Sequence, residues 1–303
     1  FFNKPCKCSL ITSHRCSVDD VRTYLLTILV DIVHIELRSE QCVPLYGNHR
    51  ILFSVDVLCI TQQTLRYIRI VQLFLGECLL TQGCEKKREA DKLRADAEAL
   101  LNRALAEGRI HARSCFGIWP AARCGDDIEV QGGAMLYSLR QQKVSDKPRM
   151  ALADFVQEKN GYVGAMQMAI TGADEWSAEL NAANDPYNAL LISALANMLA
   201  EALAECTQDC VEQIWPVEES NMVRPACGYP SQPDHQEKRT VFSLLNATER
   251  TGTTLTETCM MQPSSAICAL IFNHPSAQYF AVGPIGDDQR ADYEARSGHR
   301  LPV

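Results

Sequence analysis

The sequence R-P-A-C-G-Y-P-S-Q-P-D-H-Q-E-K, at residues 224–238, is the most distinctive stretch of this chain. Each of its prolines fixes its own φ and biases the preceding residue toward extended backbone. Gly228 can take a positive φ, or let backbone approach a ligand, without a Cβ clash. Arg224 offers a planar set of donors for a carboxylate. The composition predicts a stiff loop that holds a small zwitterionic or anionic molecule, with a proline-rich connection before a helix as the alternative.

The overall composition is ordinary for a globular chain and has an acidic balance. Of 303 residues, 47% are apolar and 22% are charged, and the formal net charge is −8. The negative balance argues against nucleic acid or an anionic membrane as a general partner. Because no run reaches the roughly eighteen uncharged apolar residues of a membrane span, we predict no membrane contact.

The number and spacing of the cysteines indicate the redox state of the cellular compartment. The 14 cysteines are irregularly spaced, and the first residues lack the basic-then-apolar order of a secretory leader. We therefore predict free thiols in a reducing cytoplasm. The spacing also differs from the paired pattern of a structural zinc site, so we predict no metal centre. Asp126-Asp127 with Glu129 could be a metal site or paired acids, but an aspartate-rich turn is the commoner meaning.

The chain divides into a first part whose secondary structure is ambiguous from sequence and a second part whose elements are clear. Residues 1–85 form a diverged lead-in whose apolar runs do not separate helix from strand, whereas residues 86–303 read clearly. The clear part begins with a charged helix predicted over residues 85–107, which has an apolar stripe and Gly108 as its C-terminal cap.

The longest predicted helix has Asp185 as N-cap and Pro186 at its first position, and it runs to about Trp215. Its leucines and alanines share one face, which indicates packing on a sheet or another helix. Glu201 and Glu205 fall on the opposite face, where solvent exposure is the simplest interpretation, although one of them could point into a cleft.

The remaining elements define the fold class. Turn-bounded runs predict strands over residues 114–119, 128–130, 135–142, 150–156, 162–171, 255–258, 266–272 and 278–282, and helices over 172–184, 237–250 and 287–296. Helices that do not strictly alternate with strands indicate α+β architecture, with a twisted, largely antiparallel sheet and flanking helices. The sequence lacks the Rossmann and P-loop glycine motifs, which disfavours those nucleotide-binding folds.

Two groups of side chains have open interpretations. Cys227, Asp234 and His235 share one loop, but a nucleophilic triad is defined by geometry, and a hydrogen-bonding role for His235 at a helix start is the simpler reading. Tyr279 and Phe280 lie on a predicted strand, so their rings should point to opposite faces. One ring can then line a cleft, where an aromatic face attracts a bound cation such as a sulfonium. Core packing is the alternative.

A series of motifs in fixed order resembles a known family. The resemblance covers about residues 85–303, and its many separate motifs make chance an inadequate explanation. It points to the S-adenosyl-L-methionine (AdoMet)-binding activation domain of cobalamin-dependent (vitamin B12-dependent) methionine synthase. The motifs are G-I-W-P-A (117–121), G-D-D-I-E-V (125–130), L-R-Q-Q (139–142), L-A-D-F-V (152–156), D-P-Y-N-A-L-L (185–191), R-P-A-C-G-Y-P-S-Q-P-D-H-x-E-K (224–238), A-T-E-R-T-G-T-T-L-T-E-T (247–258), H-P-S-A-Q-Y-F-A-V-G (274–283) and D-Q-R-A-D-Y (288–293).

The resemblance implies a function in reductive remethylation. In that family the activation domain presents AdoMet to oxidised cobalamin, and an electron from flavodoxin or a related reductase allows the corrinoid to be remethylated. Residues 86–303 would then be the AdoMet-binding activation domain of a methyltransferase, and cobalamin would reside on a partner or parent chain. We expect the chain alone to lack the homocysteine, folate and cobalamin domains.

The resemblance also assigns site residues. Carried over by motif, Arg224 would hold the AdoMet carboxylate, and no catalytic side chain is implied, because the protein positions the methyl group while the cofactor does the bond chemistry. The loop, the aromatic pair and two glutamates that face cobalamin or the ligand ammonium complete the expected site: Ala226, Cys227, Gly228, Tyr229, Tyr279, Phe280, Glu201 and Glu218.

Two departures from the family pattern support alternative functions. Leu26 stands where the family has an aspartate that touches AdoMet, and Asn197 replaces an acidic position on the long helix. One alternative is a docking module for a corrinoid protein or flavodoxin that does not depend on AdoMet. The other is a non-functional fragment whose first 85 residues do not fold.

Overall fold

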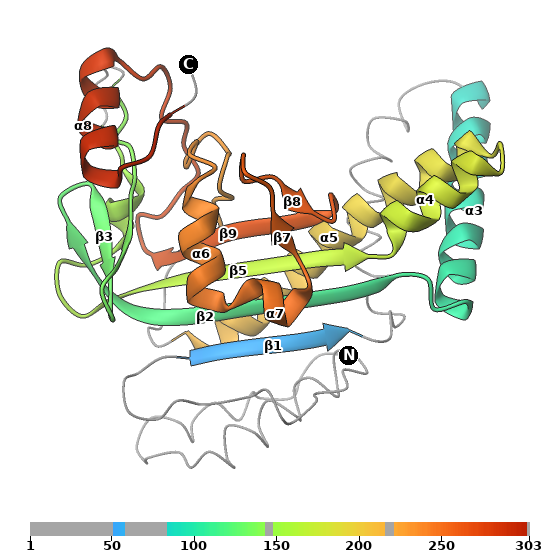
Figure 1. Ribbon diagram of the computed structural model, residues 1–303, viewed down its shortest axis with the longest axis horizontal. Helices are drawn as coiled ribbons and strands as arrows, with labels where there is room; N and C mark the ends of the chain where they lie inside the picture. The colour runs from blue at the N-terminus through green and yellow to red at the C-terminus, as the bar shows by residue number, and fades with distance from the viewer. Residues whose placement is uncertain (1–50, 58–83, 143–147, 216–220, 302–303) are drawn as a thin grey trace, which may run out of the picture.

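The fold is built on an antiparallel sheet of seven strands. The computed structural model describes residues 51–57, 84–142, 148–215 and 221–301 (Figure 1). The strand order is β4-β3-β2-β5-β9-β6, with β1 also paired to β2. This confirms the predicted α+β class with a largely antiparallel sheet. The strands are β1 (Ile51–Val57), β2 (His111–Cys124), β3 (Asp127–Val130), β4 (Ala134–Leu136), β5 (Gly161–Thr171), β6 (Asn221–Val223) and β9 (Ala266–His274); β7 (Thr254–Leu255) and β8 (Met261–Gln262) form a separate pair.

Strand β2 is the long strand to which most of the sheet attaches. Strand β5 pairs with it from His111 to Ala121 along one edge. Strands β1 and β3 share the other edge end to end, since β1 pairs with residues 112–118 and β3 with residues 121–124. Strand β5 is buried on both faces, which explains why its sequence is a nearly continuous apolar run rather than an alternating one.

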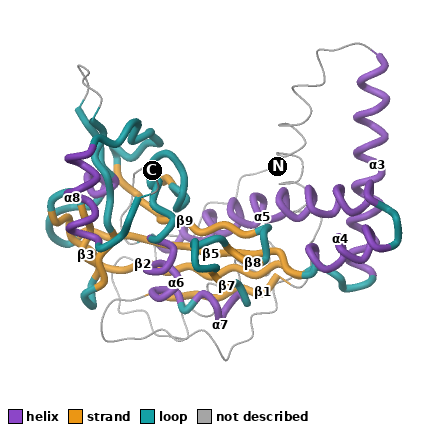
Figure 2. Tube along the Cα trace, turned by 45° about the horizontal axis from the view of Figure 1, so that its top comes forward, coloured by secondary structure: helices purple, strands orange, loops and turns teal. Residues whose placement is uncertain are grey.

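Helices cover both faces of the sheet (Figures 1 and 2). On one face lies α5, whose start is as predicted: Asp185 accepts a hydrogen bond from the Asn188 backbone N–H at 3.2 Å, and proline occupies the first turn. Helices α3 and α4 pack beside it, while α6 and α7 lie on the opposite face and α8 at one end. Their bounds are α3 (Cys84–Ala106), α4 (Ala173–Ala182), α5 (Pro186–Ile214), α6 (Glu237–Leu245), α7 (Ala247–Thr251), α8 (Asp287–Ser297), with the 3₁₀ turn η2 (Leu152–Phe155).

Two apolar cores result, one on each face. The first joins α3, α4 and α5 to the sheet and includes Met166, Ile271 and Leu203. The second joins α6, α7 and η2 to the other face and includes Phe272 and Leu245. Alternate residues of one strand serve both cores, because successive side chains of a strand point to opposite faces.

Three predicted strands were wrong in type or length. Residues 150–156 contain the 3₁₀ turn η2, because the Asp154 carboxylate accepts the Ala151 N–H at 2.9 Å and closes a helical turn. Strand β4 ends at Leu136 instead of continuing to residue 142, and β7 has two residues where four were expected.

Residues 278–282 were also wrongly predicted as a strand. The Val282 N–H donates to the Pro230 carbonyl at 2.9 Å, but Pro230 has no N–H with which to return a ladder bond. The helix predicted over 237–250 is broken in two at Asn246, which takes φ 51° and ends α6. Asparagine tolerates this left-handed conformation better than most residues do.

The structure bears only in part on the predicted boundary at residue 85 and on the predicted absence of membrane contact. Strand β1 lies within the predicted lead-in of residues 1–85 and pairs with β2, while the boundary at residue 85 stays a prediction. Helix α5 is long and apolar enough to cross a membrane by length and composition, but 56% of its most apolar window is buried inside the fold. The absence of membrane contact stays a prediction.

Candidate functional site

The distinctive loop begins as an extension of the sheet. After β6, the Leu270 N–H donates to the Pro225 carbonyl at 3.0 Å, and the Cys227 N–H donates to the Cys268 carbonyl at 3.0 Å. Ala226 forms a bridge with Ala269 of β9 between these two bonds. The loop therefore starts as a strand fixed to the core, which positions its polar side chains on rigid backbone.

A tight turn follows at residues 229–232. The Gln232 N–H donates to the Tyr229 carbonyl at 2.9 Å, and the Gly228 N–H donates to the Gln232 carbonyl at 2.7 Å. Gly228 has φ +95°, and a Cβ there would lie 2.2 Å from Cε1 of His235. This position therefore requires glycine for both its backbone conformation and the approach of the imidazole.

The segment that carries the predicted aromatic pair lies against this turn. The Phe280 N–H donates to Ser231 Oγ at 3.3 Å, and the Ser231 hydroxyl donates to the Phe280 carbonyl. The Tyr279 hydroxyl accepts the Arg224 N–H at 3.0 Å. Residues 224–232 and 279–282 thus form one unit, which we call the arginine–tyrosine site.

The two aromatic residues divide as the sequence predicted, although no strand places them. Phe280 packs inward, with its ring 6.1 Å from that of Phe155 in an edge arrangement. The Tyr279 residue is 63% exposed, and Tyr229 is equally exposed. Tyr279 is therefore accessible next to the Arg224 backbone, and Tyr229 is accessible on the turn that follows it. Exposed rings of this kind can contact a cationic or planar ligand.

The Arg224 guanidinium is held by helix α5. It donates to Gln208 Oε1 at 2.5 Å through Nη1 and to Glu205 Oε1 through Nη2. Burial lowers the pKa of Arg224, but the hydrogen bond to Glu205 and the charges of the neighbouring acidic groups together outweigh burial, and the net pKa is raised. Glu201 is exposed and adds a favourable charge interaction with the same guanidinium. The arginine is therefore charged, oriented and close to two acidic side chains.

Glu205 was wrongly interpreted as a solvated side chain. The polar face of α5 repeats every four residues and has partners on other elements. Ser193 Oγ donates to Ser177 Oγ at 3.2 Å, and the Asn197 side-chain oxygen accepts the Ser265 hydroxyl at 2.8 Å. The sequence carried no local signal of these partners, because the solvated face of an ordinary amphipathic helix repeats at the same interval.

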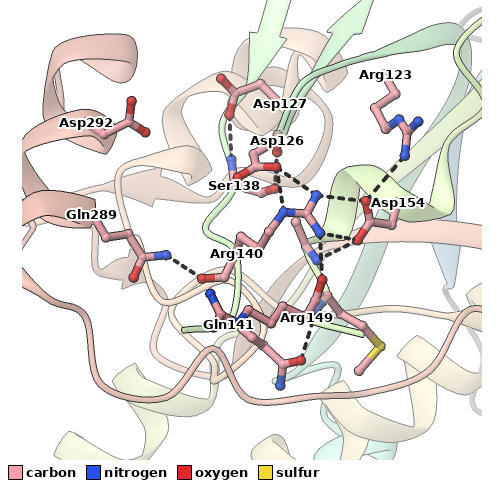
Figure 3. A network of polar contacts seen from close by, with 12 residues as sticks. Arg123, Asp126, Asp127, Ser138, Arg140, Gln141, Arg149, Asp154, Gln289 and Asp292 are labelled. Carbon is pink, nitrogen blue, oxygen red and sulfur yellow. Dashed lines mark hydrogen bonds and ion pairs between the residues drawn. The ribbon is translucent and has the colours of Figure 1, made fainter. Parts of the chain in front are cut away.

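A network of ion pairs is centred on Arg140 (Figure 3) and connects to the site through the next residue, Gln141. The Arg140 guanidinium donates to Asp154 at 2.7 and 2.8 Å and to Asp126 at 2.8 Å. The following residue extends the support, because the Gln141 side-chain amide donates to the Ala281 carbonyl at 2.8 Å. The aspartate turn therefore has a structural partner, as its commoner interpretation predicted.

The proposed nucleophile–base pair is not assembled in the described part of the chain. The Cys227 thiol is buried and forms a hydrogen bond with the Cys268 thiol. This bond and burial raise the pKa of Cys227 well above its ordinary value. His235 Nδ1 lies 2.7 Å from Lys238 Nζ. Burial and the Lys238 charge lower the pKa of His235. A protonated thiol and an imidazole with another partner do not form a catalytic dyad.

Two residues on which the sequence predictions depend lie outside the described residues. Glu218 falls in the gap at residues 216–220, and Leu26 lies in residues 1–50. The remaining predicted positions, from Arg224 to Tyr229 with Tyr279 and Phe280, come together in the arginine–tyrosine site, and Glu201 lies near it on α5.

The fold and this loop define an α+β domain whose sheet edge carries a rigid, aromatic-flanked arginine. Solved structures of the same class match it. One is described as "Crystal Structure of the MetH Reactivation Domain bound to AdoHcy"; it is 30% identical, has a TM-score of 0.73, and the match covers 82% of this chain and 86% of that chain.

Sequence comparison identifies the family. The profile described as "Vitamin B12 dependent methionine synthase, activation domain" matches residues 66–298, which is well over half of the chain. The chain belongs to this family of activation domains, which are parts of a methyltransferase. The resemblance stated from the motifs alone is confirmed.

Proposed function

We propose that this chain binds AdoMet at the arginine–tyrosine site and presents its methyl group to oxidised cobalamin on a partner or parent chain. The observation that carries the proposal is the junction of Arg224 with Tyr279. The exposed Tyr279 accepts the Arg224 backbone N–H through its hydroxyl, while the Arg224 guanidinium is oriented by Glu205 and Gln208. Support comes from the solved relative, which is described as bound to AdoHcy, the product that AdoMet becomes when it loses its methyl group.

The described residues fit the two charged ends of AdoMet. The ligand carboxylate would bind the Arg224 guanidinium in place of Glu205, and a carboxylate in this position is the natural bidentate partner of arginine. Tyr279 and Tyr229 offer exposed ring faces to the sulfonium or the adenine. The backbone at Gly228 allows close approach. The protein's contribution is positioning, which restricts the methyl group to one direction of transfer.

Cobalamin bound to another domain would supply the reduced metal that accepts the methyl group. We propose flavodoxin or a related reductase as the electron donor and the cobalamin-binding domain as the partner. The cytoplasm is the proposed location, supported by the seven cysteines in the described part of the chain that are free thiols.

Calorimetric titration of the full chain with AdoMet tests the proposal. Arg224→Ala should weaken binding by about 2–5 kcal/mol, because it removes the partner of a buried charge. Glu205→Gln should bind AdoMet no less tightly than the native chain, since it removes the anion that occupies the guanidinium. Arg109→Ala is the matched control, as this arginine pairs with Glu107 and Glu179 where α3 and α4 meet, and not with the loop that follows β6. Absence of heat with the native chain would reject the proposal.

A docking module that does not depend on AdoMet is the second candidate. The observation in its favour is that Arg224 already has two internal partners, Glu205 and Gln208. Capture of a corrinoid protein on the immobilised chain separates the two candidates. Capture that is equally strong with and without AdoMet, together with no AdoMet heat, would favour the docking module.

A further inference from the structure

A second polar cluster lies at the start of α6, apart from the arginine–tyrosine site. It consists of Asp234, Glu237 and His299, and the three candidate ligand atoms all lie within 4.8 Å of one another. His299 Nδ1 is 2.6 Å from Asp234 Oδ2 and 3.7 Å from Glu237 Oε1. The side chains of Asp234 and Glu237 are 1% and 0% exposed, whereas that of His299 is 19% exposed. Two buried acids therefore converge on one imidazole that solvent can reach.

The Glu237 carboxyl group is the observation that points to a ligand. Among the described residues neither of its oxygens has a partner in good hydrogen-bond geometry, although the Tyr137 backbone N–H is a neighbouring donor, and a buried polar group that is poorly satisfied is costly. Burial raises the pKa of Glu237, and its neighbours Cys227 and Asp234 raise it further, while the Tyr137 backbone amide lowers it in part. Protonation would remove the charge, whereas a cation would bind the carboxylate directly. The same cation would also reach Asp234, whose oxygens already have the Gln236 N–H, the Tyr293 hydroxyl and the His299 ring as hydrogen-bond partners.

The donor set indicates the class of cation. Two carboxylate oxygens and one imidazole nitrogen suit a divalent first-row transition ion, because carboxylates favour Mn²⁺ and imidazole favours Zn²⁺ and its neighbours. Ligands bonded to one such ion at about 2.0–2.2 Å lie roughly 3–3.5 Å apart. The observed separations bracket this range, so small side-chain shifts would complete the site.

Surrounding groups orient the donors as the outer partners of metal ligands do. The Tyr293 hydroxyl donates to Asp234 Oδ2 at 2.8 Å, and the Gln236 N–H donates to Asp234 Oδ1 at 2.8 Å. The His299 backbone is fixed by its N–H bond to Ser297 Oγ at 3.0 Å. These contacts restrict two of the three donors before any ion arrives.

We infer that Asp234, Glu237 and His299 bind one divalent transition-metal ion, which fastens the start of α6 to the segment that follows α8. This inference differs from the sequence-based expectation of no metal centre, which stays a prediction. That expectation rested on cysteine spacing. The three donors proposed here contain no sulfur, and His299 lies 62 residues after Glu237 in the sequence. The site does not depend on AdoMet binding.

Titration of the full chain with Mn²⁺, followed by the electron paramagnetic resonance signal of the free ion, tests the inference. Mn²⁺ is chosen because thiolates bind it poorly, which keeps the free cysteines out of the measurement. We expect one equivalent to bind. Glu237→Gln and His299→Ala should each weaken binding by about tenfold or more, given that even outer partners of a ligand contribute about 10–100-fold.

His274→Ala is the matched control, since His274 is a partly exposed histidine that bonds Ser276 and is not one of the three donors. It should bind Mn²⁺ as the native chain does. His299→Ala removes a partly exposed ring, so it keeps the test valid if Glu237→Gln fails to fold. No Mn²⁺ binding by the native chain, or equal binding by native chain and both variants, would overturn the inference and leave Glu237 as a protonated buried acid.

Discussion

Gly228→Ala isolates the role of the glycine in the arginine–tyrosine site. The added methyl would lie 2.2, 2.5 and 2.7 Å from three ring atoms of His235. Forcing a side chain into the left-handed backbone region costs about 1–2 kcal/mol, and overpacking a filled site costs a further 1–3 kcal/mol or so. The expected loss of unfolding free energy is therefore about 2–5 kcal/mol. Urea unfolding of the full chain, followed by circular dichroism, measures it.

Gly133→Ala separates the two contributions. Gly133 has φ +91°, close to the +95° of Gly228, but no atom lies within 4 Å of a Cβ built there. It should therefore lose only the conformational part, about 1–2 kcal/mol. The overlap part should be recovered when His235→Ala is combined with Gly228→Ala, since contacting residues are not additive. Equal losses at the two glycines, or no recovery in the double variant, would refute the assigned contact between Gly228 and His235.

Three further substitutions test the framework around the site. Asp154→Asn should cost about 1–2 kcal/mol near pH 7, because it removes a partly buried, charge-assisted bond to Arg140. Burial raises the pKa of Asp154, but the Arg140 and Ala151 hydrogen bonds and the two arginine charges together lower it more. The stability that Asp154 contributes is present above the pKa of the unfolded carboxyl group and is lost as the pH falls through the lower pKa of the folded one. The unfolding free energies of the native and Asp154→Asn chains should therefore become equal in acid and stay different in alkali. Gln167→Leu should cost about 1–3 kcal/mol, because it removes the 2.6 Å acceptor of the buried Thr251 hydroxyl and the donor to Thr253 Oγ1; a Gln167→Leu chain as stable as the native chain would contradict this reasoning. Leu245→Ala should cost about 2–5 kcal/mol in urea unfolding, since Leu245 is fully buried between α6 and the sheet, and a loss below about 1 kcal/mol would exclude that packing.

The sequence predicts elements whose local signals agree with their packing. Helix α5 was predicted with its correct cap, because Asp185 and Pro186 act within one turn. The small residues of β5 and the apolar run of β9 were likewise sufficient to predict these two strands from the sequence. Such elements need no knowledge of distant partners.

The errors share one physical cause, which is a partner distant in sequence. Residues 278–282 have the sequence pattern of a strand, but the Val282 N–H donates to the carbonyl of Pro230, which has no N–H to complete a strand pairing. Glu205 resembles a solvated residue until Arg224 is placed against it. The Asp234–Glu237–His299 cluster depends on a histidine from after α8. Pattern and propensity describe only what is local, so sites assembled from separate elements need the fold.

The position of β9 in the sheet has a consequence for biosynthesis. β9 pairs with β5 through partners such as Gly164 and Ile271, so one edge of β5 has no neighbour until the later strand has been synthesised. An uncovered strand edge is a template for pairing with other chains, and distant pairings form slowly. The nascent chain must therefore carry an open β5 edge through much of its translation, which makes this strand the place where chaperone binding would protect the protein.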